Sequence, residues 1–157
     1  MYKLGPVDIV LEGMTYFGIQ APFLKPYNLA HFINKIFDIE LAKTTDFESY
    51  ATGKRVDFHG YTYVSETEKI AYYFIGNKNS NVLFSNFSDM NFWFLVQFQD
   101  EFNEERLASL KEKMYNELSQ LEQVFLVVET DLERLAKYEC FLEDFSYYCT
   151  QLLQKPV

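Results

Sequence analysis

The chain has 157 residues, of which 48% are apolar and 24% are charged, and this balance is typical of one globular domain rather than of a disordered or membrane-embedded chain. A domain of this size buries about 70% of the surface that its unfolded chain exposes, so it can fold without disulfides or metals. The net charge of −9 and the absence of a lysine or arginine cluster argue against binding of nucleic acid, because neutralisation of phosphates dominates that affinity.

Aromatic residues make up 18% of the chain, which is more bulky surface than most cores of this size need. Either the core is simply aromatic, or some rings lie at a subunit contact or in a groove. No apolar run reaches the length of a membrane span, and the N-terminus lacks the pattern of a secretory signal. We therefore expect a cytoplasmic protein that does not bind membranes.

The first half of the chain predicts a strand, a helix and an antiparallel meander. β-branched and aromatic residues favour a strand over residues 9–19, in which Gly18 marks a bulge or a close approach. Apolar residues at helical spacing predict a helix over residues 27–37. Three further strands, separated by short turns, are predicted over residues 39–47, 55–64 and 69–75.

The second half predicts a crossover from one strand through a helix to another. A turn at residues 77–81 leads towards a strand over residues 91–98, and Asn103 caps a helix over Glu104–Ser119. The continuous apolar run over residues 124–128 is typical of a central strand. Because strand, helix and strand follow in this order, we expect a right-handed crossover with the two strands parallel in one sheet.

The tail over residues 131–154 contains neither glycine nor proline and predicts one amphipathic helix. This helix either packs along the chain's own sheet or docks against a second subunit or another protein. Cys140 and Cys149 lie about 13 Å apart along such a helix, beyond the reach of a disulfide, so both are expected to be free thiols. The apolar stripe consists of Leu135, Tyr138, Leu142, Phe145, Cys149 and Leu152.

These elements predict a single α+β domain with a mostly antiparallel sheet. An early helix, a β-α-β crossover and a C-terminal amphipathic helix complete the expected fold. Residues 1–130 would form the sheet domain, and residues 131–157 would form a helix packed on it or on a partner.

No motif in the chain identifies a reaction, a cofactor or a metal. The six glycines stand singly, without the spacing of a phosphate-binding loop. Two cysteines nine residues apart, with His31 and His59 far upstream, do not have the spacing of a zinc site. We therefore expect no cofactor and no metal, and the absence of a recognisable catalytic group favours a protein that is not an enzyme.

His59 is the best candidate for a polar site. Asp57, Tyr61 and Tyr63 share its face of the strand over residues 55–64, because side chains alternate along a strand. The polar face of the early helix, which includes Asn34, could join them around a small ligand. The alternative is a row of side chains on the surface of the sheet.

Short motifs along the chain match, in order, those of a known set of proteins. They are Gly18-Ile19, the helix segment at residues 27–35, the aromatic positions Phe58, Tyr61 and Tyr63, Asn77-Lys78, and the residues from Leu83 onward. In these pieces the chain resembles an uncharacterised bacterial family named for an Ile-Pro-Glu-x-x-x-Val-Asp-Tyr signature. The resemblance covers roughly residues 11–128 and implies a fold and a cytoplasmic location, but no activity.

The chain departs from this family at the naming signature. Asn86 and Asn91 replace the family's two acids, which would abolish proton transfer but keep hydrogen bonding. The resemblance therefore implies a structural role for the signature, or a divergent member that has lost a function. The residues at the six signature positions are Phe84, Ser85, Asn86, Met90, Asn91 and Phe92.

Two functions are open. The first is a non-enzymatic protein-protein interaction or accessory protein, which forms a homodimer or binds a protein partner through Tyr138, Leu142 and Phe145 of the C-terminal helix. The second is a small-ligand-binding protein or enzyme with a pocket lined by His59, Tyr61 and Tyr63.

Overall fold

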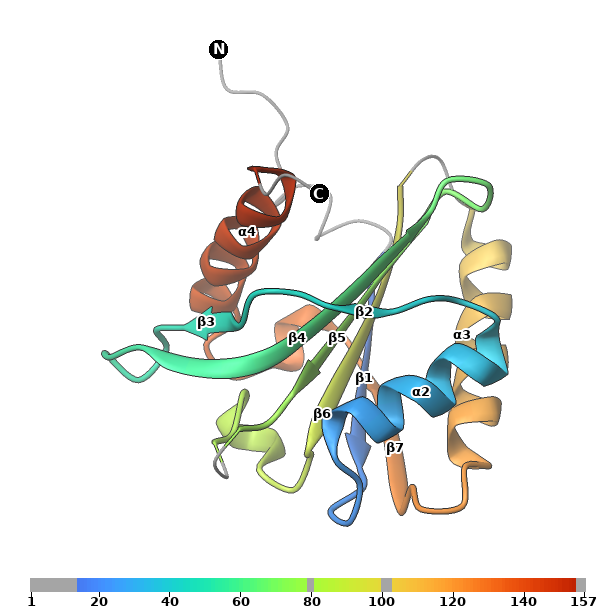
Figure 1. The fold of residues 1–157 in the computed structure, drawn as a ribbon, viewed down its shortest axis with the longest axis horizontal. Coiled ribbons are helices and arrows are strands. Elements are labelled where there is room, and N and C mark those ends of the chain that lie inside the picture. Colours follow the sequence, from blue (N-terminus) through green and yellow to red (C-terminus); the bar gives the residue numbers. More distant parts are fainter. Residues whose placement is uncertain (1–13, 79–80, 100–102, 155–157) are drawn as a thin grey trace.

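The computed structural model describes residues 14–78, 81–99 and 103–154 (Figure 1). The strands are β1 Met14–Gln20, β2 Ala42–Lys43, β3 Phe47–Ser49, β4 Val56–Ser65, β5 Ile70–Gly76, β6 Phe92–Phe98 and β7 Leu126–Thr130. The helices are α2 Pro26–Phe37, α3 Glu104–Ser119 and α4 Tyr138–Gln154, with short 3-10 turns η1 Ser85–Phe87 and η2 Leu132–Arg134.

The seven strands form an antiparallel sheet in the order β2-β4-β5-β6-β1-β7, with β3 also paired to β4. Both β6 and β7 run antiparallel to β1, so they are parallel to each other. The helix α3 connects them, which confirms the predicted pair of parallel strands joined by a helix and the α+β class. The first described strand, β1, lies between these two partners, next to the edge strand β7.

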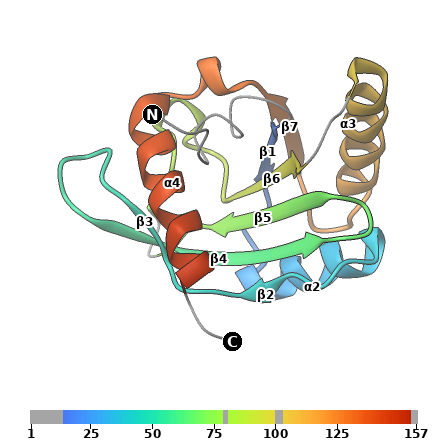
Figure 2. The ribbon, with the colours of Figure 1, turned by 90° about the horizontal axis from the view of Figure 1, so that it is seen from above.

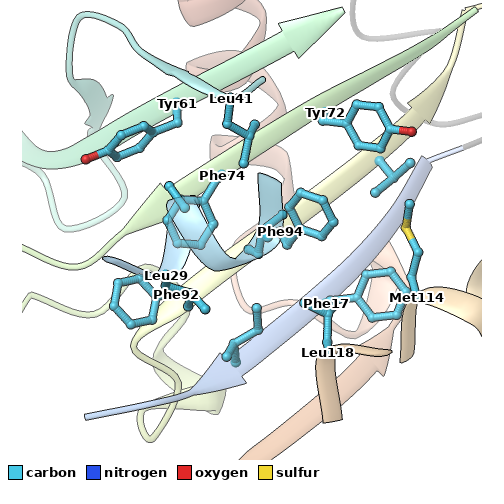
Figure 3. Packing of buried hydrophobic residues seen from close by; sticks show 14 of the residues in the cluster. Phe17, Leu29, Leu41, Tyr61, Tyr72, Phe74, Phe92, Phe94, Met114 and Leu118 are labelled. Atoms are coloured by element: carbon cyan, nitrogen blue, oxygen red, sulfur yellow. The ribbon is translucent and has the colours of Figure 1, made fainter. Parts of the chain in front are cut away.

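Helices cover both faces of the sheet, with α2 and α3 on one face and α4 on the other (Figure 2). The first face buries Phe17, Phe74 and Phe94 against Leu29 of α2 and Met114 of α3 (Figure 3). Because both faces are covered, every residue of β5 and β6 is buried and neither strand shows the alternation of a half-exposed strand.

The second face packs against α4. Trp93 of β6 and Phe58 of β4 are buried there together with Phe145 and Tyr148 of the helix. The aromatic side chains of the central strands thus fill two separate cores.

The strand predicted over residues 39–47 is wrong as a single strand, because the structure has β2 and β3 instead. Lys43 pairs with Tyr61 and Phe47 pairs with Phe58. The four residue steps from Lys43 to Phe47 therefore lie opposite only three residue steps on β4. The additional residue makes a β-bulge, which shifts the alternation of side chains by one position. Lys43 lies over the ring of Tyr61, whereas Phe47 enters the core under α4.

The tail is not one helix from residue 131, as the periodicity predicts, because η2 and α4 are separate. Lys137 has a φ of 56°, a left-handed conformation that cannot continue a right-handed helix. The side chain of Asn86 holds this break: its Nδ2 donates to Arg134 O at 2.6 Å, and its Oδ1 accepts from Ala136 N at 2.9 Å. The helix α4 therefore begins at Tyr138 and is aimed across the sheet.

Two glycines allow close packing on the α4 side of the sheet. A Cβ atom at Gly18 would lie 2.9 Å from Met90 Cγ, which identifies the predicted special position as a close approach. A Cβ atom at Gly60 would lie 2.6 Å from the Tyr148 hydroxyl. That hydroxyl and Thr44 Oγ1 are 2.6 Å apart and share a hydrogen bond, so α4 touches the backbone of β4 where a side chain would separate them.

Candidate functional site

The predicted row His59, Tyr61 and Tyr63 lies on the α2 side of β4, but two of its rings pack against neighbouring side chains. Tyr61 is buried with its ring centroid 5.7 Å from that of Phe74. Tyr63 is stacked on Tyr72 with centroids 6.1 Å apart. Both contacts belong to the first core and explain these aromatics as packing residues.

Asn34, the fourth residue predicted for this site, ties the end of α2 to the chain that follows it. Leu41 N donates to Asn34 Oδ1 at 2.8 Å, and Asn34 Nδ2 donates to Leu41 O at 3.3 Å. Both polar ends of the amide are thus used by one backbone residue, and the contact fixes the entry into β2.

His59 belongs to a charged cluster that the β-bulge assembles. Asp46 lies 3.3 Å from Lys43 Nζ and 2.6 Å from Lys78 Nζ. Burial opposes ionisation of Asp46, but the hydrogen bonds from Lys78 and Lys43 outweigh it and hold the pKa of this carboxyl below its usual value. The bulge is what turns Asp46 towards the two ammonium groups.

The surroundings of His59 disfavour the charged form of its imidazole. Burial, reinforced by the positive charges of Lys43 and Lys78, lowers the pKa of His59. Its Nδ1 is buried and has no hydrogen-bond partner within the described part of the chain. Among the described residues no group of three His, Cys, Asp or Glu side chains is placed to hold a metal ion.

The residues predicted for a partner surface on the C-terminal helix face the chain's own sheet. Phe145 is fully buried and meets the ring of Tyr73 at 4.8 Å. Leu142 is also buried, and Tyr138 is half-buried against the same core. Of the two predicted alternatives the structure has the first, in which the helix packs on its own sheet, so this stripe is not accessible to another chain.

Both cysteines of α4 are free, as predicted. The Sγ atom of Cys149 lies 3.9 Å from the Tyr73 hydroxyl. Burial raises the pKa of the Cys149 thiol to about 11, with the Tyr73 hydrogen bond acting in the opposite direction. A thiol with this pKa carries almost no thiolate at neutral pH and is a poor nucleophile.

Asn86 and Asn91 both bind backbone groups of distant segments. Asn86 bridges to the break before α4. Asn91 Oδ1 accepts from Ala21 N at 2.8 Å, which ties the start of β6 to the turn after β1. These hydrogen bonds account for both side chains as structural connections.

An exposed aromatic pair lies at the end of the sheet where β1 leaves and β7 begins. Phe23 is 76% exposed and Phe125 is 58% exposed, and their rings meet edge to face with centroids 5.7 Å apart. Leu126, at 46% exposure, follows directly in the chain. These three residues form the Phe23–Phe125 patch. The sequence reading missed it because Phe23 lies between two prolines and Phe125 belongs to an apolar run typical of a buried strand.

The patch adjoins an open edge of the sheet. The prediction of a central strand over residues 124–128 is wrong in position, because β7 is last in the strand order and pairs only with β1. Among the described residues no strand occupies its other side. Residues 122–133, which include β7, contain four acids and no base. Glu129 is the one acid within the strand, and it reaches Lys111 of α3 at 3.3 Å.

A cavity of about 340 Å³ lies between the β3–β4 turn, the segment before η1 and the start of α4. Its apolar part includes Val56, Phe58 and Leu83, and Lys137 lies at the α4 side. We call this cavity the hairpin groove. A second and more open cavity, of about 460 Å³, lies between Phe98 and α3. Neither cavity is lined by His59, Tyr61 or Tyr63.

The fold and these surfaces define an α+β protein whose seven-stranded antiparallel sheet has helices on both faces and β7 at one edge. No family model matches the chain, and no curated protein matches it. In the described part of the chain, no helix has both the length and the apolar character needed to cross a bilayer.

Proposed function

We propose that this is a non-enzymatic interaction protein that binds an extended segment of another protein along β7. The single observation that carries the proposal is the exposed Phe23–Phe125 patch beside the open edge of the sheet. The proposal keeps the class of function favoured by the composition but moves the binding surface from α4 to β7, because the inward stripe of α4 is buried.

The patch offers apolar anchors for a partner. Two phenylalanine rings that are more than half exposed contact each other, and the half-exposed Leu126 follows Phe125 in the chain. Fully burying one such side chain is worth about 1.5–3 kcal/mol. Contiguous exposed apolar side chains of this kind mark interaction surfaces more often than isolated ones do.

The edge of β7 offers main-chain hydrogen bonds. An extended peptide that adds a strand to a sheet gains its affinity from such bonds and its specificity from alternate side chains. Proteins usually protect an exposed edge with lysine, proline or a covering loop. The five residues of β7 contain neither lysine nor proline, and no described strand pairs with its outer side, so within the described part of the chain this edge is open to pairing.

Charge selects the partner. Two copies of β7 side by side would bring together the acids of residues 122–133, in a protein whose net charge is already −9. A segment that carries lysine or arginine between its apolar residues would instead meet opposite charge. A basic, extended segment of another protein therefore fits this edge better than a second copy of the chain.

The test uses a fluorescent hexapeptide of alternating valine and lysine, with a valine and glutamate peptide as its counterpart. Anisotropy should report binding of the lysine peptide only. Phe125→Ser should weaken that binding about tenfold, because it removes one buried ring from the complex. Tyr115→Ser is the matched control, since Tyr115 is an exposed aromatic on α3 outside the patch.

Two outcomes would overturn the proposal. One is equal binding of the lysine and glutamate peptides, or none by either. The other is a sedimentation mass of two chains that Phe125→Ser returns to one, which would assign the patch to a homodimer.

The hydrogen bonds of Asn86 and Asn91 also bear on the family resemblance. We infer that the signature positions serve the fold in this chain, because each amide joins two segments that are far apart in sequence. This supports the first of the two alternatives that the resemblance implies, a structural role for the signature.

A further inference from the structure

We propose that the hairpin groove binds a small amphiphile, with an apolar body and one anionic group such as a carboxylate. This goes beyond the proposed function, because the groove shares no residue with the Phe23–Phe125 patch or with β7. It also lies away from the row on β4 that the sequence indicated for a ligand.

The size and floor of the groove suit an apolar body. Its volume of about 340 Å³ is at the lower end of the range of ligand pockets, which is about 300–1,000 Å³. Phe58 and Leu83 are buried residues that reach its surface, and Val56 lies beside them. A chain of a few methylenes would displace water from these side chains, whereas a fully polar ligand would gain nothing from them.

The walls of the groove are held in place without a ligand. Lys137 Nζ donates to Ala51 O at 2.9 Å, which joins the start of α4 to the β3–β4 turn. On the same turn, Tyr50 N donates to Asp144 Oδ2 at 3.0 Å. Asn86 fixes residues 134–136 from the other side. A pocket that is formed in advance saves the entropy that a loop would lose on ordering around its ligand.

The charge of the lining selects an anion. Lys137 is the one ionisable residue among the eleven described residues that line the groove, in a protein with a net charge of −9. An ammonium has three donors, and the bond to Ala51 O uses one of them. Ser49 and Ser85 line the same space, and their hydroxyls can complete the contacts to a carboxylate.

The backbone at Lys137 supports a functional reason for its position. Its left-handed conformation, with φ of 56°, is unfavourable for a residue with a side chain. Such outliers cluster at ligand clamps and active sites, where surrounding contacts hold them. Here the hydrogen bonds of Asn86 and of Lys137 itself supply those contacts.

The experiment titrates the full chain with octanoate, using octanol and octylammonium as probes of equal length. Amide resonances of residues around the groove should shift with octanoate, less with octanol and least with octylammonium. Lys137→Gln keeps a donor for Ala51 O but loses the charge, so octanoate binding should weaken about tenfold while octanol binding stays the same.

Lys54→Gln is the matched control, because Lys54 belongs to the same turn but does not line the groove. Thermal melting of each variant separates lost binding from lost folding. The proposal fails if Lys137→Gln binds octanoate as the unsubstituted protein does, if octanol and octanoate bind equally well, or if the shifted resonances belong to the patch instead. If the groove does not bind octanoate, the result of the peptide-binding experiment at β7 is unaffected, because the two experiments measure binding at different residues.

Discussion

At the scale of single residues, the β-bulge has the largest consequence. If side chains alternated regularly from Lys43, Phe47 would lie on the same face of the sheet as Lys43. The bulge instead sends Asp46 to the two ammonium groups and Phe47 into the second core. One backbone irregularity thereby creates the charged cluster and completes a hydrophobic one.

The first prediction concerns the pH dependence that His59 contributes to stability. Burial, Lys43 and Lys78 lower its pKa in the folded state, while Asp46 acts in the opposite direction. As the pH falls through the unfolded value of 6.5, the unfolded chain takes up a proton that the folded chain still excludes. The free energy of unfolding should therefore decrease from pH 6.5 down to the lowered folded pKa.

Urea unfolding of the unsubstituted protein and of His59→Gln, in steps from pH 7.5 to pH 4.5, would check this. His59→Gln should flatten the curve in this window. Asp46 cannot account for the slope, because its pKa lies below its usual value of 3.8 and its contribution is lost only at lower pH. A slope that persists unchanged in His59→Gln would assign it to another group.

At the scale of elements, local patterns predict the helices well and the strand partners poorly. The spacing of apolar residues in α2 and the Asn103 cap of α3 are local signals, and the structure confirms both helices. The position of β1 between β6 and β7 depends on contacts between distant segments. The pattern of residues within a strand does not show whether the strand lies at the edge or at the centre of a sheet. The apolar run over residues 124–128 therefore predicts a central strand, whereas β7 lies at the edge.

The candidate site was less predictable than the fold for a related reason. Alternation correctly placed His59 and Tyr61 on one face of β4, but it could not show that Tyr61 would be covered. The break at Lys137 has no sequence signal either, because a lysine in a left-handed conformation replaces the expected glycine. The hydrogen bonds that hold it come from Asn86, about fifty positions away.

The second prediction follows from that break. Asn86→Ala removes both hydrogen bonds to the segment before α4 and should lower the free energy of unfolding by about 1–2 kcal/mol. Asn86→Asp keeps an acceptor for Ala136 N but loses the donor to Arg134 O, so its effect should be intermediate. Chemical denaturation of the three proteins measures the order. Equal stability of all three would mean that water replaces the amide and that the break is held by other contacts.

At the scale of the whole molecule, the two cores explain where the aromatic residues go. Each face of the central strands meets helices, so a single sheet can bury rings in two layers. The second core therefore depends on α4, because Trp93, Phe58 and Phe84 lie on the face of the sheet that this helix covers. The C-terminal helix is thus a part of the fold, whereas the exposed rings at β7 lie outside both cores.

The third prediction distinguishes these two roles of aromatic residues. Phe145→Ala removes a fully buried ring that contacts Tyr73 and Phe141, so it should lower the free energy of unfolding by about 3–5 kcal/mol. Tyr147→Ala is the matched change on the outer face of the same helix, where the ring is 50% exposed, and it should alter stability by about 0.5 kcal/mol or less. Urea unfolding at a single low protein concentration measures both. If α4 served mainly to dock a partner, Phe145→Ala would leave the unfolding of the isolated chain unchanged, since its ring would have no core to leave.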